Sequence, residues 1–230
     1  MPSDAPKAKI DAARGRGAEV RLYDRVKESR EAIAAEIAQK SGATTVRPFD
    51  DSWTMAGQGT SGLEAAHDAK AKGVTFGSLI CNVSGGGLLA GVAVAFEALS
   101  PSTEVWAAEP AGHDDLIRSL EAKRLVSNAP GIRSIADALL SPEPGVLTFE
   151  IHKRRVKGGF TASNDQLLDA MSFAFHHLKL VVEPGGAVSL AVLLANRAHF
   201  AARGPVLIIL SGGNVDAALF SQAIARSPNA

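Results

Sequence analysis

The chain has 230 residues, 46% of them hydrophobic, and its 24 Lys and Arg residues balance 24 Asp and Glu residues. A chain of this size can bury the core of one large domain or two small ones. The neutral balance and the lack of any basic run argue against nucleic acid as a partner, and no apolar run approaches the ~20 residues of a membrane span. The single Cys81 excludes a disulfide framework and a cysteine metal cluster, and the first residues lack the apolar core of a secretory signal, so we expect a cytoplasmic protein.

The first third of the chain alternates predicted helices and strands. The expected elements are helices at 4–16, 25–40 and 55–72, a half-buried strand at 19–23, and a loop or short strand at 46–52. Ser3 or Asp4 is the expected cap of the first helix.

The remainder repeats this alternation with more strongly apolar strands. The expected elements are strands at 76–83, 105–108 and 206–210, and helices at 114–123, 164–178 and 187–203. The run at 206–210 is continuously apolar, which is typical of a buried parallel strand. The alternation predicts an α/β fold in which helices cover both faces of parallel sheet, making three layers.

The segment Ser84-Gly85-Gly86-Gly87-Leu88 is the most informative, because there a predicted strand runs into a helix. Consecutive glycines let the backbone turn tightly and approach a ligand with no side chain in the way. The helix that follows directs free N–H groups and its positive dipole end back at the loop, an arrangement that binds anions and most often phosphate. The alternative is a plain strand-to-helix turn, but three glycines in a row favour the ligand site.

Polar residues follow other apolar runs. In an open parallel sheet, ligands bind beyond the carboxyl ends of the strands, so Ser84–Leu88, Glu183 and Ser211 are expected on one edge. Each also has a simpler interpretation: Glu183 as an acid favoured by a helix dipole, and Ser211 as a helix cap.

Acidic residues after the strand at 105–108 have two interpretations as well. Glu109, with Asp114 and Asp115 a turn away, has oxygens at a spacing that suits a hard cation, although such acids more often start a helix.

Two further patterns carry no assignment. Gly57–Gly62 matches the three-glycine dinucleotide pattern, but no apolar strand precedes it, so a ligand-facing helix start or a packing turn fits better. The six histidines show neither zinc spacing nor a nearby nucleophile, and none is assigned chemistry.

Taken together, these segments resemble the threonine/serine dehydratase group of fold-type-II pyridoxal-phosphate enzymes, which also includes serine racemases. The resemblance runs through nearly the whole chain in the family's order. It rests on Pro48-Phe49-Asp50-Asp51, Ala56-Gly57-Gln58-Gly59-Thr60, the glycine loop, Lys179–Ala187 and Ser211-Gly212-Gly213-Asn214-Val215-Asp216.

The resemblance implies roles for the residues at the expected edge. The phosphate of pyridoxal 5′-phosphate (PLP) would be bound by Ser84, Gly85, Gly86, Gly87 and Leu88. Position 84 is usually glycine in the family, and Ser84 adds a hydroxyl. Ser211 would hydrogen-bond the pyridine nitrogen, and Glu183 would lie near that edge of the ring. Some relatives bind Mg²⁺ or Ca²⁺, which here implies Glu109, the carbonyl of His113 and Asp115.

Two family segments have no match. They are the Schiff-base lysine segment, of the type Ser-Phe-Lys-x-Arg-Gly-Ala, and the Ser-x-Gly-Asn-His substrate loop, so no catalytic residue is assigned. Both lie upstream of the family segment that matches Met1–Pro6, so the chain resembles a dehydratase that is N-terminally truncated. Residues 1–54 are then the remainder of the small domain, and residues 55–230 most of the large PLP-binding domain.

The implied parent reaction is loss of water from L-threonine or L-serine to give a 2-oxo acid and ammonia. We expect a homo-oligomer that acts on a small amino acid, and a chain that is inactive by itself. Two alternatives stay open: an inactive fragment or pseudoenzyme that binds a phosphate ligand or a partner, and racemase activity on the same scaffold. The sequence does not choose among threonine, serine and hydroxyaspartate.

Overall fold

The computed structural model describes residues 1–226 and divides into two compact units, Met1–Arg47 and Pro48–Ala230. The boundary between the units follows Arg47, whereas the boundary predicted from the sequence follows residue 54. That these units are the small and large domains of a dehydratase stays a prediction.

The first unit contains two helices, α1 (Lys7–Gly15) and α2 (Arg30–Ser41). The prediction of a strand at 19–23 is wrong, because only an isolated bridge joins Tyr23 to Pro2. Helix α2 begins later than expected because the side chain of Ser29 caps it by accepting the Ala32 N–H at 3.2 Å. The N-cap of α1 is Pro6 rather than Ser3 or Asp4.

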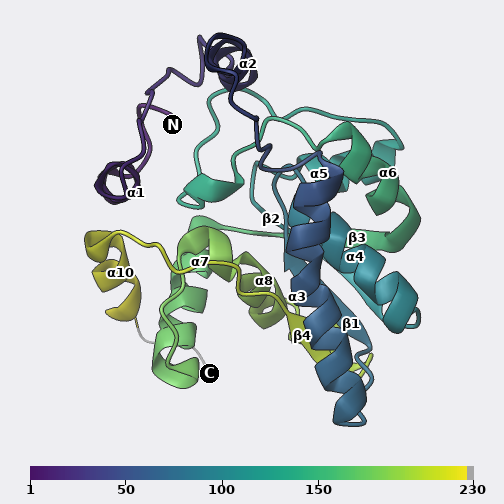
Figure 1. Cartoon of the computed structure of the whole chain (residues 1–230). Helices are drawn as coiled ribbons and strands as arrows, with labels where there is room; N and C mark the ends of the chain where they lie inside the picture. The colour runs from purple at the N-terminus through teal and green to yellow at the C-terminus, as the bar shows by residue number, and fades with distance from the viewer. Residues whose placement is uncertain (227–230) are drawn as a thin grey trace. The chain divides into compact units, whose positions relative to one another are not determined.

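The second unit is built on a four-stranded parallel sheet with the order β3-β2-β1-β4 (Figure 1). The strands are β1 (Ser78–Asn82), β2 (Glu104–Pro110), β3 (Val156–Ala162) and β4 (Val206–Ile208). All of β1 is buried, as expected for a central strand covered on both faces. The parallel sheet predicted from the sequence is confirmed.

Helices cover both faces of this sheet and form two cores. One core contains side chains of α3 (Ser52–Ala71), α4 (Gly87–Leu99), α5 (Asp115–Ala122) and α6 (Val146–Arg155). The other contains side chains of α7 (Asn164–Phe173), α8 (Pro184–Ala195), α9 (Arg197–Ala201) and α10 (Ala217–Ile224). Leu79 and Cys81 of β1 face the first core and Ile80 the second, which is the alternation of a strand. The predicted three-layer α/β fold is therefore confirmed.

Several boundaries differ from those expected. The helix expected at 187–203 begins at Pro184, a residue suited to a first helical turn, and is interrupted at Asn196. The helix expected at 164–178 becomes a π-helical turn at Ala174–Leu178. A 3₁₀ turn lies at Asp137–Leu139. Elements α6, β3 and α10 were not expected.

The glycines at 57–62 lie inside α3, so a ligand-facing helix start was wrong there. Asp51 caps α3 by accepting the Thr54 N–H at 2.9 Å. A Cβ on Gly59 would lie 2.8 Å from the Gly91 oxygen, so this glycine lets α3 and α4 touch backbone to backbone. Among residues 1–226, no helix has the length and apolar character that crossing a membrane requires.

Candidate functional site

The glycine loop lies where β1 ends and α4 begins. Helix α4 has no side-chain cap at its N-terminus, and its N-cap residue Gly86 has a φ of 95°. Within the described residues, no amide N–H from Ser84 to Leu88 donates a hydrogen bond to a protein acceptor. Free amides at a helix N-terminus form an anion site.

The surroundings of the loop leave no room for side chains. A Cβ on Gly86 would lie 2.4 Å from Cε1 of His152, and one on Gly85 would lie 2.3 Å from Cδ1 of Phe49. Real Cβ atoms do not approach other atoms so closely, and the φ of Gly86 is itself unfavourable for other residues. The local packing therefore requires glycine at both positions.

Helix α6 holds the carbonyl groups of the loop. The Gly85 oxygen accepts hydrogen bonds from Thr148 Oγ1 at 2.8 Å and from the Gly145 N–H at 3.0 Å. The Gly86 oxygen lies 3.1 Å from Nε2 of His152, and because a carbonyl only accepts, that nitrogen carries the hydrogen. Complete burial lowers the pKa of His152 to about 4, so the ring is neutral at neutral pH. These contacts fix the loop through its carbonyls and leave its amides available.

Ser84 contributes a hydroxyl beside the amides. Its Oγ accepts the Ser141 N–H at 3.1 Å, so its own hydrogen remains available to a ligand.

Ser211 and Glu183 lie at the same edge of the sheet as the glycine loop. Asn82, the last residue of β1, donates from Nδ2 to Ser211 Oγ at 3.1 Å. The Glu183 N–H donates to the Gly212 oxygen at 3.0 Å, which joins the start of α8 to the segment after β4. The structure thus brings together the three segments that the topology placed on one edge, and their ligand contacts stay predictions.

The comparisons with known proteins agree on the family. The family described as pyridoxal-phosphate dependent enzyme matches residues 1–212. This chain belongs to that family. Its α/β architecture is also that of solved relatives: a threonine deaminase from T.th. has a TM-score of 0.85 and 42% identity, covering 94% of this chain and 69% of that one.

Curated relatives with different names are about equally similar. A serine racemase of Schizosaccharomyces pombe is 37% identical over 217 residues, which are 94% of this chain and 65% of the racemase. A beta-hydroxyaspartate dehydratase of Paracoccus denitrificans is 36% identical over 217 residues, which are 94% of this chain and 66% of the dehydratase. The chain thus spans about two thirds of the length of these relatives, and their names do not agree on one activity.

The glycine loop and Ser211 suit the PLP that defines the family. The loop has free amides for a phosphate and packing that admits no side chain, and Ser211 has a hydroxyl for a ring nitrogen. Sequence reasoning missed three supporting residues, Asn82, Thr148 and His152. None belongs to a motif, since each acts through a backbone group or a side chain far along the sequence.

The predicted metal ligands have other contacts in this structure. Glu109 Oε1 accepts the Leu116 N–H at 3.0 Å, and Oε2 accepts the Ile117 N–H at 2.9 Å. Asp115 Oδ1 accepts from Asn128 Nδ2 at 2.6 Å, and Nε2 of His113 lies 3.3 Å from the Ile132 oxygen. Residues 1–226 contain no group of three or more His, Cys, Asp and Glu side chains suited to a metal ion. The simpler interpretation, an acid at a helix start, describes what Glu109 does here.

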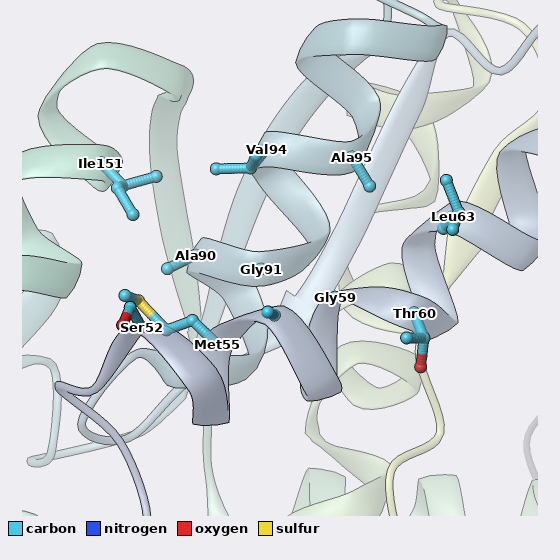
Figure 2. Close-up of a pocket in the computed structure, with 11 residues that line it drawn as sticks. Ser52, Met55, Gly59, Thr60, Leu63, Ala90, Gly91, Val94, Ala95 and Ile151 are labelled. Carbon is cyan, nitrogen blue, oxygen red and sulfur yellow. The ribbon is translucent and has the colours of Figure 1, made fainter.

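A separate apolar pocket of about 330 Å³ lies between α3 and α4 (Figure 2). Its walls include Met55, Leu63, Val94 and Ile151, with Ser52 and Thr60 as polar side chains. None of the predicted phosphate- or ring-binding residues lines it, so it is distinct from the glycine-loop site.

Proposed function

We propose that this chain forms the phosphate- and ring-binding part of a PLP-dependent ammonia-lyase that acts on L-threonine or L-serine. The observation that carries the proposal is the row of free amides from Ser84 to Leu88 at the uncapped start of α4, with Ser211 bonded to Asn82, two residues before the loop. When bound, PLP withdraws electrons from the α-carbon of an amino acid.

The chain's own residues have distinct tasks in this proposal. The loop amides and the dipole of α4 bind the phosphate, and the Ser84 hydroxyl adds a donor. Ser211 donates to the ring nitrogen and keeps it unprotonated, which favours elimination over chemistry that needs a stronger electron sink. Glu183 lies near that edge of the ring.

No lysine of this chain is assigned to the Schiff base, so we expect PLP binding without turnover by the chain as given. An inactive protein that binds a phosphate ligand or a partner shares this expectation. Calorimetric titration with PLP, pyridoxal and inorganic phosphate tests the site. We expect PLP to bind at least about tenfold more tightly than pyridoxal, because the phosphate contacts are charge-assisted. Equal binding of PLP and pyridoxal would contradict the phosphate site.

Ser211→Ala separates binding of the PLP ring, proposed at Ser211, from binding of the phosphate, proposed at the glycine loop. We expect it to weaken PLP binding by about threefold to tenfold, the range for one net hydrogen bond, and to leave inorganic phosphate binding unchanged. Equal loss for both ligands would place Ser211 outside the ring-binding half.

Serine racemase activity is the second candidate, because several similar relatives carry that name. Assays for 2-oxo acid and for D-serine, on protein that includes a Schiff-base lysine segment, distinguish the two. Formation of D-serine without 2-oxo acid would replace the lyase proposal.

We also propose that Mg²⁺ or Ca²⁺ binds at Glu109, the His113 carbonyl and Asp115. The supporting observation is that Glu109, His113 and Asp115 are all buried where β2 ends and α5 begins, so carboxyl groups are held there away from water. A rise in melting temperature with Ca²⁺ that Asp115→Asn removes is expected, and no rise would contradict the site.

We also propose that the chain forms a homo-oligomer and is located in the cytoplasm. Leu63 and Val94, which line the pocket between α3 and α4, are 42% and 43% exposed, and apolar surface of this kind favours association. Sedimentation at several concentrations is expected to show a dimer or larger species, and a monomer throughout would contradict it.

A further inference from the structure

Asn82 is a buried polar residue that connects three separate segments. It is 3% exposed and lies at the carboxyl end of β1, two residues before the glycine loop. Its carboxamide contacts the backbone of α8 at Gly186 and Ser189, and the segment after β4 at Ile209 and Ser211.

The orientation of this carboxamide is fixed by its neighbours. The Ser189 N–H can only donate, and the amide atom facing it at 2.6 Å is therefore the oxygen Oδ1. The Gly186 oxygen can only accept, so the atom facing it at 3.1 Å is Nδ2. A flipped amide would bring two donors together on one side and two acceptors together on the other.

Nδ2 has two hydrogens for three neighbouring oxygens. The Gly186 oxygen and Ser211 Oγ both lie at 3.1 Å, and the Ile209 oxygen lies at 3.3 Å. The Ile209 oxygen already accepts from Ser189 Oγ at 2.5 Å. We assign the two hydrogens of Asn82 to the two nearer acceptors, the Gly186 oxygen and Ser211 Oγ, since the Ile209 oxygen is farther away and already has the Ser189 hydroxyl as a donor.

This assignment determines the role of the Ser211 hydroxyl. Because Nδ2 has no lone pair to offer, Ser211 Oγ must accept from it and keeps its own hydrogen for another acceptor. Within the described residues Ser211 Oγ donates no hydrogen bond. An oxygen that accepts one hydrogen bond also becomes a better donor in the next.

We infer that Asn82 is a positioning residue that sets Ser211 as a hydrogen-bond donor to the ring nitrogen of the bound ligand. The inference rests on the proposed function, since that ring is PLP. Asn82 touches no ligand atom in this account and acts through Ser211. A purely structural Asn82 would only join β1 to α8 and would leave the donor direction of Ser211 unaffected.

A double-mutant cycle of Asn82→Leu and Ser211→Ala separates these roles. We expect Asn82→Leu to weaken PLP binding by about threefold to tenfold, the range of one net hydrogen bond, and to change binding of inorganic phosphate by less than about twofold. The double variant is expected to bind PLP as Ser211→Ala does. Additive losses in the double variant would overturn the inference.

The matched control is Asn196→Leu, at the other end of α8. Its Nδ2 donates to the Val192 oxygen at 2.8 Å, so the variant also removes an asparagine that bonds the helix backbone. Both variants are expected to lower the melting temperature, and only Asn82→Leu to weaken PLP binding. Equal loss of PLP binding in both would show a structural effect and overturn the inference.

The ring nitrogen itself supplies a readout other than affinity. With PLP labelled with ¹⁵N in the ring, the bound resonance of the wild-type chain is expected to show a neutral nitrogen that accepts a hydrogen bond. Asn82→Leu is expected to move this resonance in the same direction as Ser211→Ala. An unchanged resonance would overturn the inference.

Ser189→Ala is a milder second variant if Asn82→Leu does not fold. It frees the Ile209 oxygen to compete for Nδ2, so we expect PLP binding to weaken by about twofold or more through the same path. Unchanged PLP affinity would count against the hydrogen assignment and overturn the inference. Failure of the wild-type chain to bind PLP would refute the proposed function and the inference together. If wild type binds PLP and these variants bind it equally well, only the inference is refuted.

Discussion

Two helix N-termini at the same edge of the sheet have opposite electrostatic environments. Helix α4, after β1, begins at glycines with no side-chain cap and with free amides from Ser84 to Leu88. Helix α5, after the neighbouring strand β2, has its first-turn amides occupied by both carboxylate oxygens of Glu109. Both helices carry a positive dipole end there, but only at α5 do carboxyl oxygens of the described residues accept the first-turn amides.

The difference shows how to separate a binding site from a structural acid at one edge of a sheet. The carboxyl group at α5 is costly to ionise, because burial and then the charge of Asp115 raise the pKa of Glu109 well above its usual range. At α4 no protein acceptor among residues 1–226 takes the equivalent amides, and the neighbouring contacts hold loop carbonyls instead. A ligand anion is therefore expected at α4, and changes at the two sites should have different effects.

Gly86→Val should have the largest effect. Its side chain would meet His152, with Cβ 2.4 Å from Cε1, at a φ of 95°. We expect loss of PLP binding and a loss of unfolding free energy of about 3 kcal/mol or more, from overpacking and backbone strain. Calorimetry and urea unfolding measure the two quantities.

Gly57→Ala is the matched control for that variant. A Cβ on Gly57 meets nothing within 4 Å, and Gly57 lies inside α3. It should stabilise the chain by about 0.5–1 kcal/mol and leave PLP affinity unchanged. If Gly86→Val bound PLP normally, the phosphate would have to bind elsewhere than at α4.

Glu109→Ala should affect stability without affecting the ligand. It leaves the N–H groups of Leu116 and Ile117 without their acceptor, for which we expect a loss of about 3 kcal/mol of unfolding free energy. PLP affinity should stay within about twofold. The control is the exposed Glu121 of α5, where Glu121→Ala should change stability by less than about 0.5 kcal/mol. A large loss of PLP binding in Glu109→Ala would mean that the two helix starts are one site.

Asp115 should make the free energy of unfolding depend on pH. Burial raises the pKa of its carboxyl from 3.8 to about 6. A raised pKa in the folded state contributes stability that is present below pH 3.8 and is lost as pH rises through 6. Relative to wild type, Asp115→Asn should therefore gain about 2 kcal/mol between pH 4 and pH 7. Urea unfolding of both proteins at the two pH values measures this, and parallel curves would contradict it.

His152→Leu should have the smallest effect, because it removes one hydrogen bond to the Gly86 oxygen. We expect a loss of about 1 kcal/mol in stability and about threefold in PLP affinity. His152→Gln keeps an N–H donor and should recover part of both losses. The pKa of His152 is about 4 in the folded chain and 6.5 for an ordinary histidine, so near pH 6 the unfolded wild type binds a proton that the folded chain does not. The stability advantage of wild type over His152→Leu should therefore shrink by about 0.8 kcal/mol from pH 8 to pH 6. A difference that grew toward pH 6 would contradict a neutral ring.

The sequence by itself determined the elements whose signals are local. The apolar runs around Leu79, Val105 and Leu207 are long enough to identify parallel strands, and all three are strands of the sheet. The glycine loop was evident because three glycines between a strand and a helix have few other uses. Strand β3 was missed because Val-Lys-Gly-Gly-Phe-Thr-Ala has no apolar run, and it forms by pairing with β2. The opposite error, a strand predicted where none forms, occurred at 19–23. The residues there alternate between polar and apolar, but only an isolated bridge between Tyr23 and Pro2 forms.

Only the tertiary structure decided which polar residues support the site and which hold the fold together. From the sequence Glu109 was a candidate metal ligand or an acid at a helix start, and only the structure shows that its oxygens accept from the amides of α5. His152 and Gly86 are 66 positions apart, and Asn82 and Ser211 are 129 apart. Hydrogen bonds between such distant segments leave no periodicity or motif in the sequence, because the chain brings the partners together only when the sheet forms. Short-range patterns therefore specify the elements and the loop, whereas the direction of a single hydroxyl depends on contacts that exist only in the folded protein.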